Sequence, residues 1–130
     1  MSKDVLKIIS EAMKSLGLAY GFVEYSGNEE GVIVYPYFTG EYTEAEMFDE
    51  SGMTEATFLL TGFSRDSWDA LEDAKERIER HFNRVSGDVR ITDSGSAVAI
   101  FYAYSLVVPT GDAELKSIQI NLKINEWKVI

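Results

Sequence analysis

The chain has 130 residues, of which 45% are hydrophobic, so it can form one compact domain, residues 1–130, with a core of its own. It contains no cysteine, which excludes disulfides, thiolate catalysis and cysteine-ligated zinc. Its 22 acidic and 12 basic residues give a net charge of −10, which argues against binding nucleic acid by neutralising phosphates.

The first predicted element is a helix that Ser2 can cap and that Gly17 ends. Between them, apolar residues recur at intervals of three and four positions, as they do on one buried face of a helix. These residues are Val5, Ile8, Ile9, Ala12, Met13 and Leu16. One face of this helix is therefore expected in the core.

A long β-hairpin is predicted next. Its first strand is GVIVYPYF at 31–38, which is rich in β-branched and aromatic residues. Pro36 cannot donate to a ladder, so this strand is expected at a sheet edge or with a bulge near its middle. An acid-rich stretch leads to the second strand, TEATFLLTGF at 54–63, with the hairpin tip expected near residues 50–52.

The second strand runs through Ser64 into a second helix that begins near Arg65. Its buried stripe is expected to comprise Trp68, Leu71, Ala74, Ile78 and Phe82. Gly62 and Ser64 match the start of a nucleophile elbow, G-x-S-x-G, but Asp66 stands in place of the second glycine. The single histidine, His81, lies 17 positions after Ser64, about 25 Å up the same helix. Ser64 or Asp66 is therefore predicted to cap the helix, and Ser64 has no base beside it.

Three further strands are predicted at 88–92, 96–109 and 117–130. In the last of them apolar and polar residues alternate until Trp127 breaks the parity, so a bulge or a strand end is expected near Asn125. The order α-β-β-α-β-β-β, with short connections, predicts an α+β fold in which two helices pack on a mostly antiparallel sheet of about five strands.

The strand within 96–109 is apolar on both faces. Val98, Ile100, Tyr102, Tyr104 and Leu106 are expected on one side, with Ala97, Ala99, Phe101, Ala103 and Val107 on the other. Such a strand needs cover on both faces, and two helices can cover only one side of the sheet. Either the sheet curls on itself or another subunit covers the second side, and the sequence leaves both possibilities open.

No site for chemistry stands out. The acid-rich stretch at 41–55 lacks the calcium-loop pattern, and no phosphate-binding glycine motif occurs. His81 is interpreted as a partly buried or surface imidazole. The apolar run at 97–109 is too short to cross a bilayer as a helix, and the N-terminal segment carries charges throughout. We therefore expect a soluble protein made in the cytoplasm, with no enzymatic activity, metal or cofactor.

Three passages carry a resemblance to a known family. They are YPYFTGEYTEAE at 35–46, TFLLTGFSRDSWDALEDAKERIERHF at 57–82 and ITDSGSAVAIFYAYSLVVPTGDAELKSIQINLKINEW at 91–127. The most telling pieces are Gly-Glu-Tyr at 40–42, Trp68 with Leu71, Pro-Thr-Gly-Asp-Ala-Glu-Leu at 109–115, and Trp127. Over roughly residues 30 to 129, the chain resembles the tail-terminator or tail-completion proteins of long-tailed bacteriophages and prophages of Gram-positive bacteria.

This resemblance implies an α+β subunit of a ring, commonly hexameric, that caps the tail tube and meets the head connector. Its partners would be further copies of itself, the major tail tube protein and the head connector protein, in the bacterial cytoplasm during assembly and then in the virion tail. No catalytic residue comes with the resemblance. The candidate interface residues are Met47, Phe48, Asp49, Glu50 and Met53 in the hairpin, and Tyr102, Tyr104, Asp112 and Glu114 beyond the second helix.

Two other functions stay open. An acidic cytosolic inhibitor could cover the basic surface of a partner protein by electrostatic complementarity. A hydrolase could use Ser64 or the hairpin carboxylates, although no spacing recommends any pair of them. Oligomeric state separates the inhibitor from the ring subunit, because an inhibitor is expected to be monomeric or dimeric.

Overall fold

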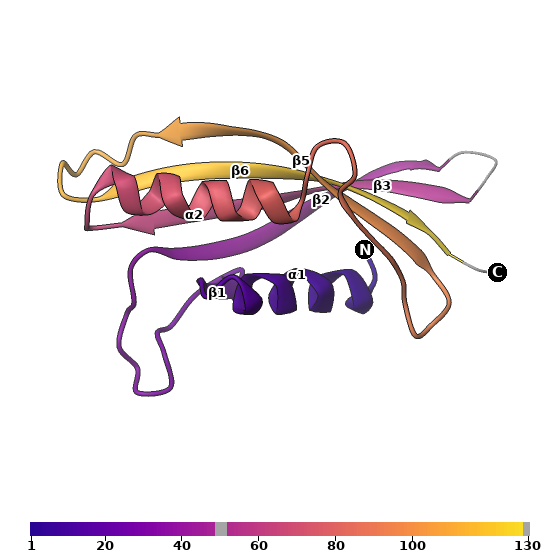
Figure 1. The fold of residues 1–130 in the computed structure, drawn as a ribbon, viewed down its shortest axis with the longest axis horizontal. Helices are drawn as coiled ribbons and strands as arrows, with labels where there is room; N and C mark the ends of the chain where they lie inside the picture. Colours follow the sequence, from indigo (N-terminus) through magenta and orange to yellow (C-terminus); the bar gives the residue numbers. More distant parts are fainter. Residues whose placement is uncertain (49–51, 129–130) are drawn as a thin grey trace.

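The computed structural model describes residues 1–48 and 52–128 of the chain, with the side chains of 1–44 and 52–128. Its elements follow in the order α1 (Lys3–Ser15), β1 (Ala19–Phe22), β2 (Tyr37–Phe48), β3 (Met53–Ser64), α2 (Trp68–His81), β4 (Asp88–Ile91), β5 (Ala97–Val108) and β6 (Lys116–Trp127). Figure 1 shows a long, twisted sheet with the two helices lying along it. Neither described helix has the length and apolar character that crossing a bilayer requires.

The described residues form one six-stranded sheet in the order β1-β2-β3-β6-β5-β4. β1 runs parallel to β2, and the other neighbouring pairs are antiparallel. The α+β class is confirmed. The expected sheet of about five mostly antiparallel strands is wrong, because the curled sheet is mixed and has six strands. The sequence does not predict β1, since four residues are too few to show a period and the partner strand begins only at Tyr37.

The first helix forms as its apolar periodicity predicts. Ser2 is the N-cap of α1, and its hydroxyl accepts a hydrogen bond from the Val5 amide at 3.4 Å. Gly17 adopts a φ of +73°, a left-handed value that glycine takes without strain, just after the helix ends. Val5, Ile9 and Met13 are fully buried, so the predicted face does lie in the core.

The first strand of the hairpin starts later than predicted. β2 begins at Tyr37, after a cis peptide bond between Tyr35 and Pro36, and residues 31–36 are not part of a strand. These residues belong to the loop between β1 and β2, where the Asn28 side chain accepts hydrogen bonds from the amides of Glu30 and Val32. Pro36 is therefore outside the ladder, where its missing N–H costs no hydrogen bond. The hairpin itself is confirmed, and residues 49–51 of its tip lie outside the described residues.

The second helix starts later than Ser64 or Asp66 would place it. Ser64 is the last residue of β3 and is fully buried, and its hydroxyl accepts a hydrogen bond from the Asp66 amide at 3.0 Å. The N-cap of α2 is Ser67, so the capping prediction is wrong. The chain needs the intervening residues to turn from strand to helix, and Ser64 stabilises that turn. Of the predicted stripe, Leu71, Ala74, Ile78 and Phe82 are buried, whereas Trp68 is partly exposed.

The sequence predicts a bulge or a strand end near Asn125. β6 pairs with β3 without interruption from Lys116 to Trp127, so the bulge is absent, and the strand ends two residues beyond Asn125. The register shift falls between Tyr102 and Tyr104 of β5. One extra residue there moves all later side chains of β5 to the other face of the sheet.

Both helices cover the same side of the sheet. The core joins side chains of α1 and α2 to alternate residues of the long strands, among them Phe38, Phe58, Ile100 and Ile120. The other side, called the open face below, carries the intervening residues. Because of the bulge, Val98, Ile100 and Tyr102 face the helices, while Tyr104, Leu106 and Val108 are on the open face. The sequence-based grouping of Tyr104 and Leu106 with Val98 is therefore wrong.

Candidate interaction surface

The second half of β5 has no strand beside it. β4 pairs with β5 only from Ala97 to Ile100. The Tyr102 amide then donates to the Phe82 carbonyl at 2.7 Å. From residue 103 to residue 108, no described residue makes a backbone hydrogen bond on the outer side of the strand. We call residues 103–108 the β5 free edge.

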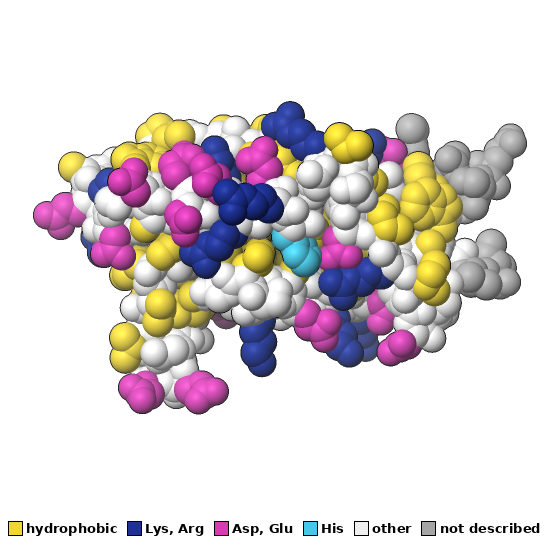
Figure 2. All heavy atoms as spheres, viewed as in Figure 1, with side chains coloured by type: hydrophobic (Ala, Val, Ile, Leu, Met, Phe, Trp, Pro, Cys, Tyr) yellow, Lys and Arg dark blue, Asp and Glu magenta, His cyan; other side chains and the backbone are white. Residues whose placement is uncertain are grey.

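The β5 free edge is apolar and exposed. Tyr104, Leu106 and Val107 have exposed fractions of 55%, 42% and 58%. No charged residue occurs between 103 and 108. Figure 2 shows hydrophobic atoms at the surface near the end of β5, along the upper edge of the view. Folded monomers usually protect an edge strand with lysine, proline or a covering element, so this edge has the properties of an association site.

A second free edge lies on the opposite side of the sheet. β1 pairs with β2 only from Tyr37 to Gly40, and the Val23 amide adds a hydrogen bond to the Gly40 carbonyl at 2.7 Å. Beyond Gly40, no described residue pairs with the outer side of β2. We call residues 41–48 the β2 free edge. Its described side chains, from Glu41 to Glu44, are all exposed, and Glu44 forms an ion pair with the amino group of Met1.

The two free edges lie at diagonal corners of the sheet. Following the register across the four long strands puts Gly40 in the row of Ser105 and Glu44 in the row of Ile100. The part of β2 that β1 covers is therefore level with the β5 free edge, and the part of β5 that β4 covers is level with the β2 free edge. β1 and β4 are short strands, four residues each, that fill the two remaining corners.

Negative charge is concentrated in one part of the chain. Residues 17–64, which include β1, β2 and β3, contain nine of the acidic residues and none of the 12 basic ones. The rest of the chain is close to neutral. On α2, for example, Glu72 pairs with Lys75 at 2.9 Å and Asp73 pairs with Arg77 at 3.0 Å. Figure 2 shows acidic and basic side chains interleaved over this helix. The excess charge therefore belongs to the β2 side of the sheet and not to the β5 side.

The open face contains a shallow hollow of about 460 Å³, lined among others by Thr43, Thr57, Tyr104, Asn121 and Lys123. Asn121 is buried at its floor, and the Asn121 Nδ2 atom has no hydrogen-bond partner among the described residues. No histidine or cysteine lines the hollow. Its polar groups can bond to a partner that covers the open face, but they do not form a nucleophile with a base.

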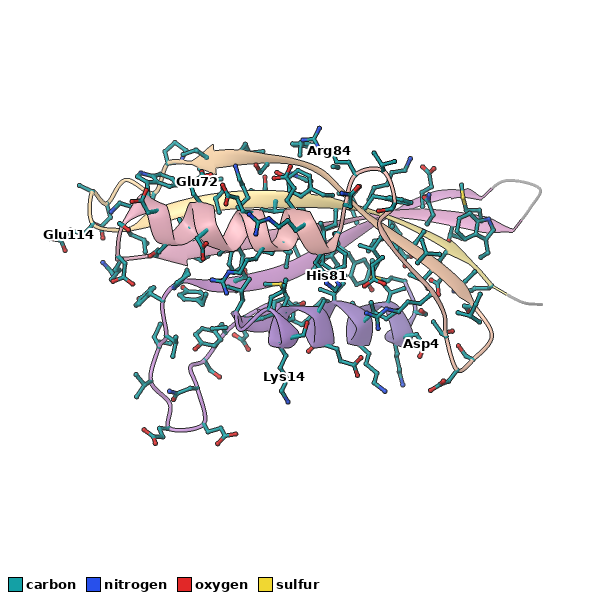
Figure 3. The ribbon with its side chains drawn as sticks, viewed as in Figure 1. Asp4, Lys14, Glu72, His81, Arg84 and Glu114 are labelled. Atoms are coloured by element: carbon teal, nitrogen blue, oxygen red, sulfur yellow. The ribbon has the colours of Figure 1, made fainter. Side chains whose placement is uncertain are left out.

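The residues considered for catalysis do not meet. His81, at the end of α2 (Figure 3), has its Nε2 atom 2.9 Å from Asp88 Oδ2, and Asp88 also accepts from Arg90 Nε at 2.8 Å. Partial burial alone would raise the pKa of the Asp88 carboxyl, but the hydrogen bonds from Arg90 and His81 outweigh it and lower that pKa. This group joins α2 to β4. Ser64 hydrogen-bonds only to the Asp66 amide among the described residues, so no base activates it.

No described cluster of three or more histidine, cysteine, aspartate or glutamate side chains could hold a metal ion. Arg65, in the segment between β3 and α2, forms an ion pair at 3.5 Å with Asp112 in the turn after β5. The Asp112 side chain also accepts from the Glu114 amide at 2.9 Å. Both acids of this turn are exposed, and Glu114 points away from the body in Figure 3.

The remaining interface candidates have mixed positions. Tyr104 lies on the β5 free edge, whereas Tyr102 is only 4% exposed and is a core residue. Met53 is half-buried in β3. Met47 and Phe48 belong to β2 with side chains outside the described part, and Asp49 and Glu50 lie outside the described residues.

The sequence-based interface candidates did not include Leu106 and Val107, or residues 41–44 of the β2 free edge. The signal for Leu106 and Val107 was an apolar run without charge, and the short length of β4 is what leaves that run uncovered in the described structure.

A scan of the chain against protein-family models gives no match, and a search of curated proteins gives none either.

Proposed function

We propose that the protein is a non-enzymatic structural subunit that self-associates into a ring, and that this ring ends a bacteriophage or prophage tail tube and joins it to the head connector. The observation that carries the proposal is the β5 free edge, where Tyr104, Leu106 and Val107 are exposed beside backbone groups that no described residue pairs with. An edge of this kind promotes uncontrolled association in a monomer. A ring in which every copy covers the edge of its neighbour removes that liability.

The charge distribution suits a position on the path of DNA. Nine acidic residues without a basic one between 17 and 64 give one part of the subunit a strongly negative field. A negative surface repels the phosphates of DNA and keeps it from sticking. The resemblance of residues 35–46, 57–82 and 91–127 to tail-terminator proteins supports the same role. On this proposal the subunit assembles in the bacterial cytoplasm and ends in the virion tail.

The same acidic segment supports a second candidate function, an inhibitor that covers a basic protein partner. Opposite surface fields speed such an encounter and make it sensitive to salt. This candidate leaves the apolar β5 edge without a role, so we place it second.

Molar mass measured by light scattering over a wide range of protein concentration tests the first function. We expect a closed oligomer that appears as rings in electron micrographs and binds the ends of purified tail tubes. A chain that stays monomeric at millimolar concentration and does not bind tube ends overturns the proposal. Salt-sensitive binding of that monomer to a cationic protein would support the inhibitor instead.

A further inference from the structure

We infer that neighbouring subunits join through their sheets, with the β5 free edge of one copy pairing antiparallel with the β2 free edge of the next copy. This inference rests on the proposed self-association and specifies the surface that produces it. The occupant of each free edge is therefore a second copy of this chain. The contact is heterologous, so repeating it by rotation gives a ring instead of a two-fold dimer.

The strand directions permit this contact. β2, β3, β6 and β5 are neighbours in the sheet, and each adjacent pair is antiparallel. β2 and β5 of one chain consequently run in opposite directions. A second copy placed beside the first in the same orientation presents its β2 antiparallel to the β5 of the first. The alternation of directions then continues from one subunit into the next, as in other cases where a strand is added to a sheet edge.

The short strands β1 and β4 restrict how the copies can be placed. β1 covers residues 37–40 of β2, and β4 covers residues 97–100 of β5. Since these strands fill diagonal corners, two copies can pair only if they are offset along the strands by about four residues, a third of a long strand. Each free edge then ends close to where a short strand begins. The sheet outline thus selects one offset and blocks longer, sliding overlaps.

At this offset, the residues that lie opposite each other in the two copies are on the same face of the sheet. If Val108 at the end of β5 lies opposite Glu41, the first uncovered residue of β2, then Leu106 lies opposite Thr43, and both are on the open face. Val107 then lies opposite Tyr42, and both are on the helix side. Tyr42 is 39% exposed, although it is aromatic. The contact therefore places an exposed apolar side chain of one edge against an exposed apolar side chain of the other.

The charges favour pairing of a β5 free edge with a β2 free edge over pairing of two β2 free edges. Two β2 edges would bring Glu41 and Glu44 together with the same residues of a second copy, and like charges across a strand pair are unfavourable. The β5 edge is uncharged, and Arg84 lies next to it with its guanidinium 5.2 Å from the Tyr102 ring centre. Figure 3 shows Arg84 beside β5 and pointing away from the body. Arg84 has no ion-pair partner among the described residues, so it can face the acidic edge of the neighbour.

Disulfide trapping tests the contact directly, because the chain contains no cysteine of its own. The variant carries Thr43→Cys and Leu106→Cys in one chain. Within a subunit β3 and β6 lie between these positions, and three strand spacings alone separate them by at least about 14 Å. A disulfide needs Cα atoms closer than about 7 Å, so every bond formed must join two subunits. Under mild oxidation we expect a ladder of covalent oligomers on a non-reducing gel, ending at the ring size and collapsing on reduction.

The matched control carries Thr39→Cys with Leu106→Cys. Thr39 is on the same strand and the same face as Thr43, but β1 covers it. We expect this control to give at least tenfold less covalent product. A circular dichroism spectrum like that of the original chain shows that each variant has folded.

Each result has a distinct meaning. Native oligomers with no Thr43-dependent ladder overturn the edge contact while leaving the ring proposal in place. Covalent dimers from Leu106→Cys alone indicate that two β5 edges pair, which also overturns it. A monomer at every concentration removes both the contact and the proposed function.

Discussion

The two halves of β5 have similar composition and opposite surroundings. In the first half, β4 lies on one side and β6 on the other, and Val98, Ile100 and Tyr102 are buried under the helices. In the second half β6 is the single strand neighbour among the described residues, and Tyr104 and Leu106 are exposed. Burial is thus decided by the cover that the helices and neighbouring strands give and by the bulge between the halves, not by the residue types. The first half stabilises the subunit, and the second half is available for association.

The largest expected effect follows from removing a side chain in the first half. Ile100→Ala leaves a cavity where the side chain is fully buried, so the free energy of unfolding should fall by about 2–5 kcal/mol. Leu106→Ala in the second half is the matched control, and its effect on the monomer should stay within about 0.5 kcal/mol. Urea denaturation of dilute protein measures both. Equal losses for the two variants would mean that the halves do not differ in the way described.

Association, unlike stability, is expected to depend on the second half of β5. Leu106→Lys puts a charge on the β5 free edge, which opposes strand pairing. The variant loses the burial of one leucine, about 1.5–3 kcal/mol, so the dissociation constant should rise about tenfold or more. Val85→Lys is the control, because Val85 is exposed on the loop after α2 and outside the free edge. Sedimentation velocity at several concentrations gives both constants. Weakening of equal size in the two variants would argue for a general charge effect.

The lack of cover along β5 can be predicted from the sequence. The run at 97–108 is apolar at both parities, so a strand short of cover is predictable without a structure. The helices and β6 are predictable for the same reason, since Ile9, Ile78 and Ile120 belong to periodic patterns several turns or strand repeats long.

Which half of β5 is covered depends on its pairing with other strands, and not on its own residues. The bulge between Tyr102 and Tyr104 shows only in the pairing with β6, where the partner residues Leu122 and Asn121 lie 20 and 17 positions further along the chain. The bare edge depends on the length of β4, and that strand ends at Ile91 without a distinctive residue. The N-cap at Ser67 was missed because three polar residues, Ser64, Asp66 and Ser67, compete for the position. Pairing across the sheet selects among options that the sequence leaves open.

A smaller effect is expected from replacing Asp88, which helps to keep β4 beside the first half of β5. Asp88 joins β4 to α2 through Arg90 and His81, so Asp88→Asn should loosen β4 and destabilise the fold by about 1 kcal/mol at neutral pH. The pKa of the Asp88 carboxyl is lower in the folded chain than in the unfolded one. Its stabilisation is therefore present above the ordinary aspartate pKa, about 3.9, and is lost as the pH falls through the folded value.

Thermal melts of the original chain and of Asp88→Asn should consequently differ at pH 7 and converge in acid. Asp93→Asn, in the exposed turn after β4, is the control and should match the original chain at both pH values. Hydrogen exchange at residues 97–100 should also quicken in Asp88→Asn, because β4 is their outer partner. A difference in melting temperature that persists in acid would show that the ionised carboxylate is not what holds β4.

The smallest effect is expected from replacing Arg84, where subunit stability and association can be measured separately. Arg84 lies over the buried Tyr102 of the first half and beside the free second half. Arg84→Ala should cost about 0.5–1 kcal/mol of subunit stability, the loss of one exposed cation–π contact. If Arg84 also faces the acidic β2 edge of a neighbour, the same variant should weaken association and reduce its dependence on salt, because screened charge attraction is removed.

Arg80→Ala is the matched control for this test, since Arg80 is an exposed arginine on α2 that pairs within its own helix with Glu76. It should leave both association and its salt dependence unchanged. An Arg84→Ala variant that loses a little stability and assembles with an unaltered salt profile would confine Arg84 to the covered half of β5. The attraction between unlike edges would then have to come from Val107, Tyr42 and the backbone alone, and replacing Glu41 with glutamine should leave assembly unaffected in turn.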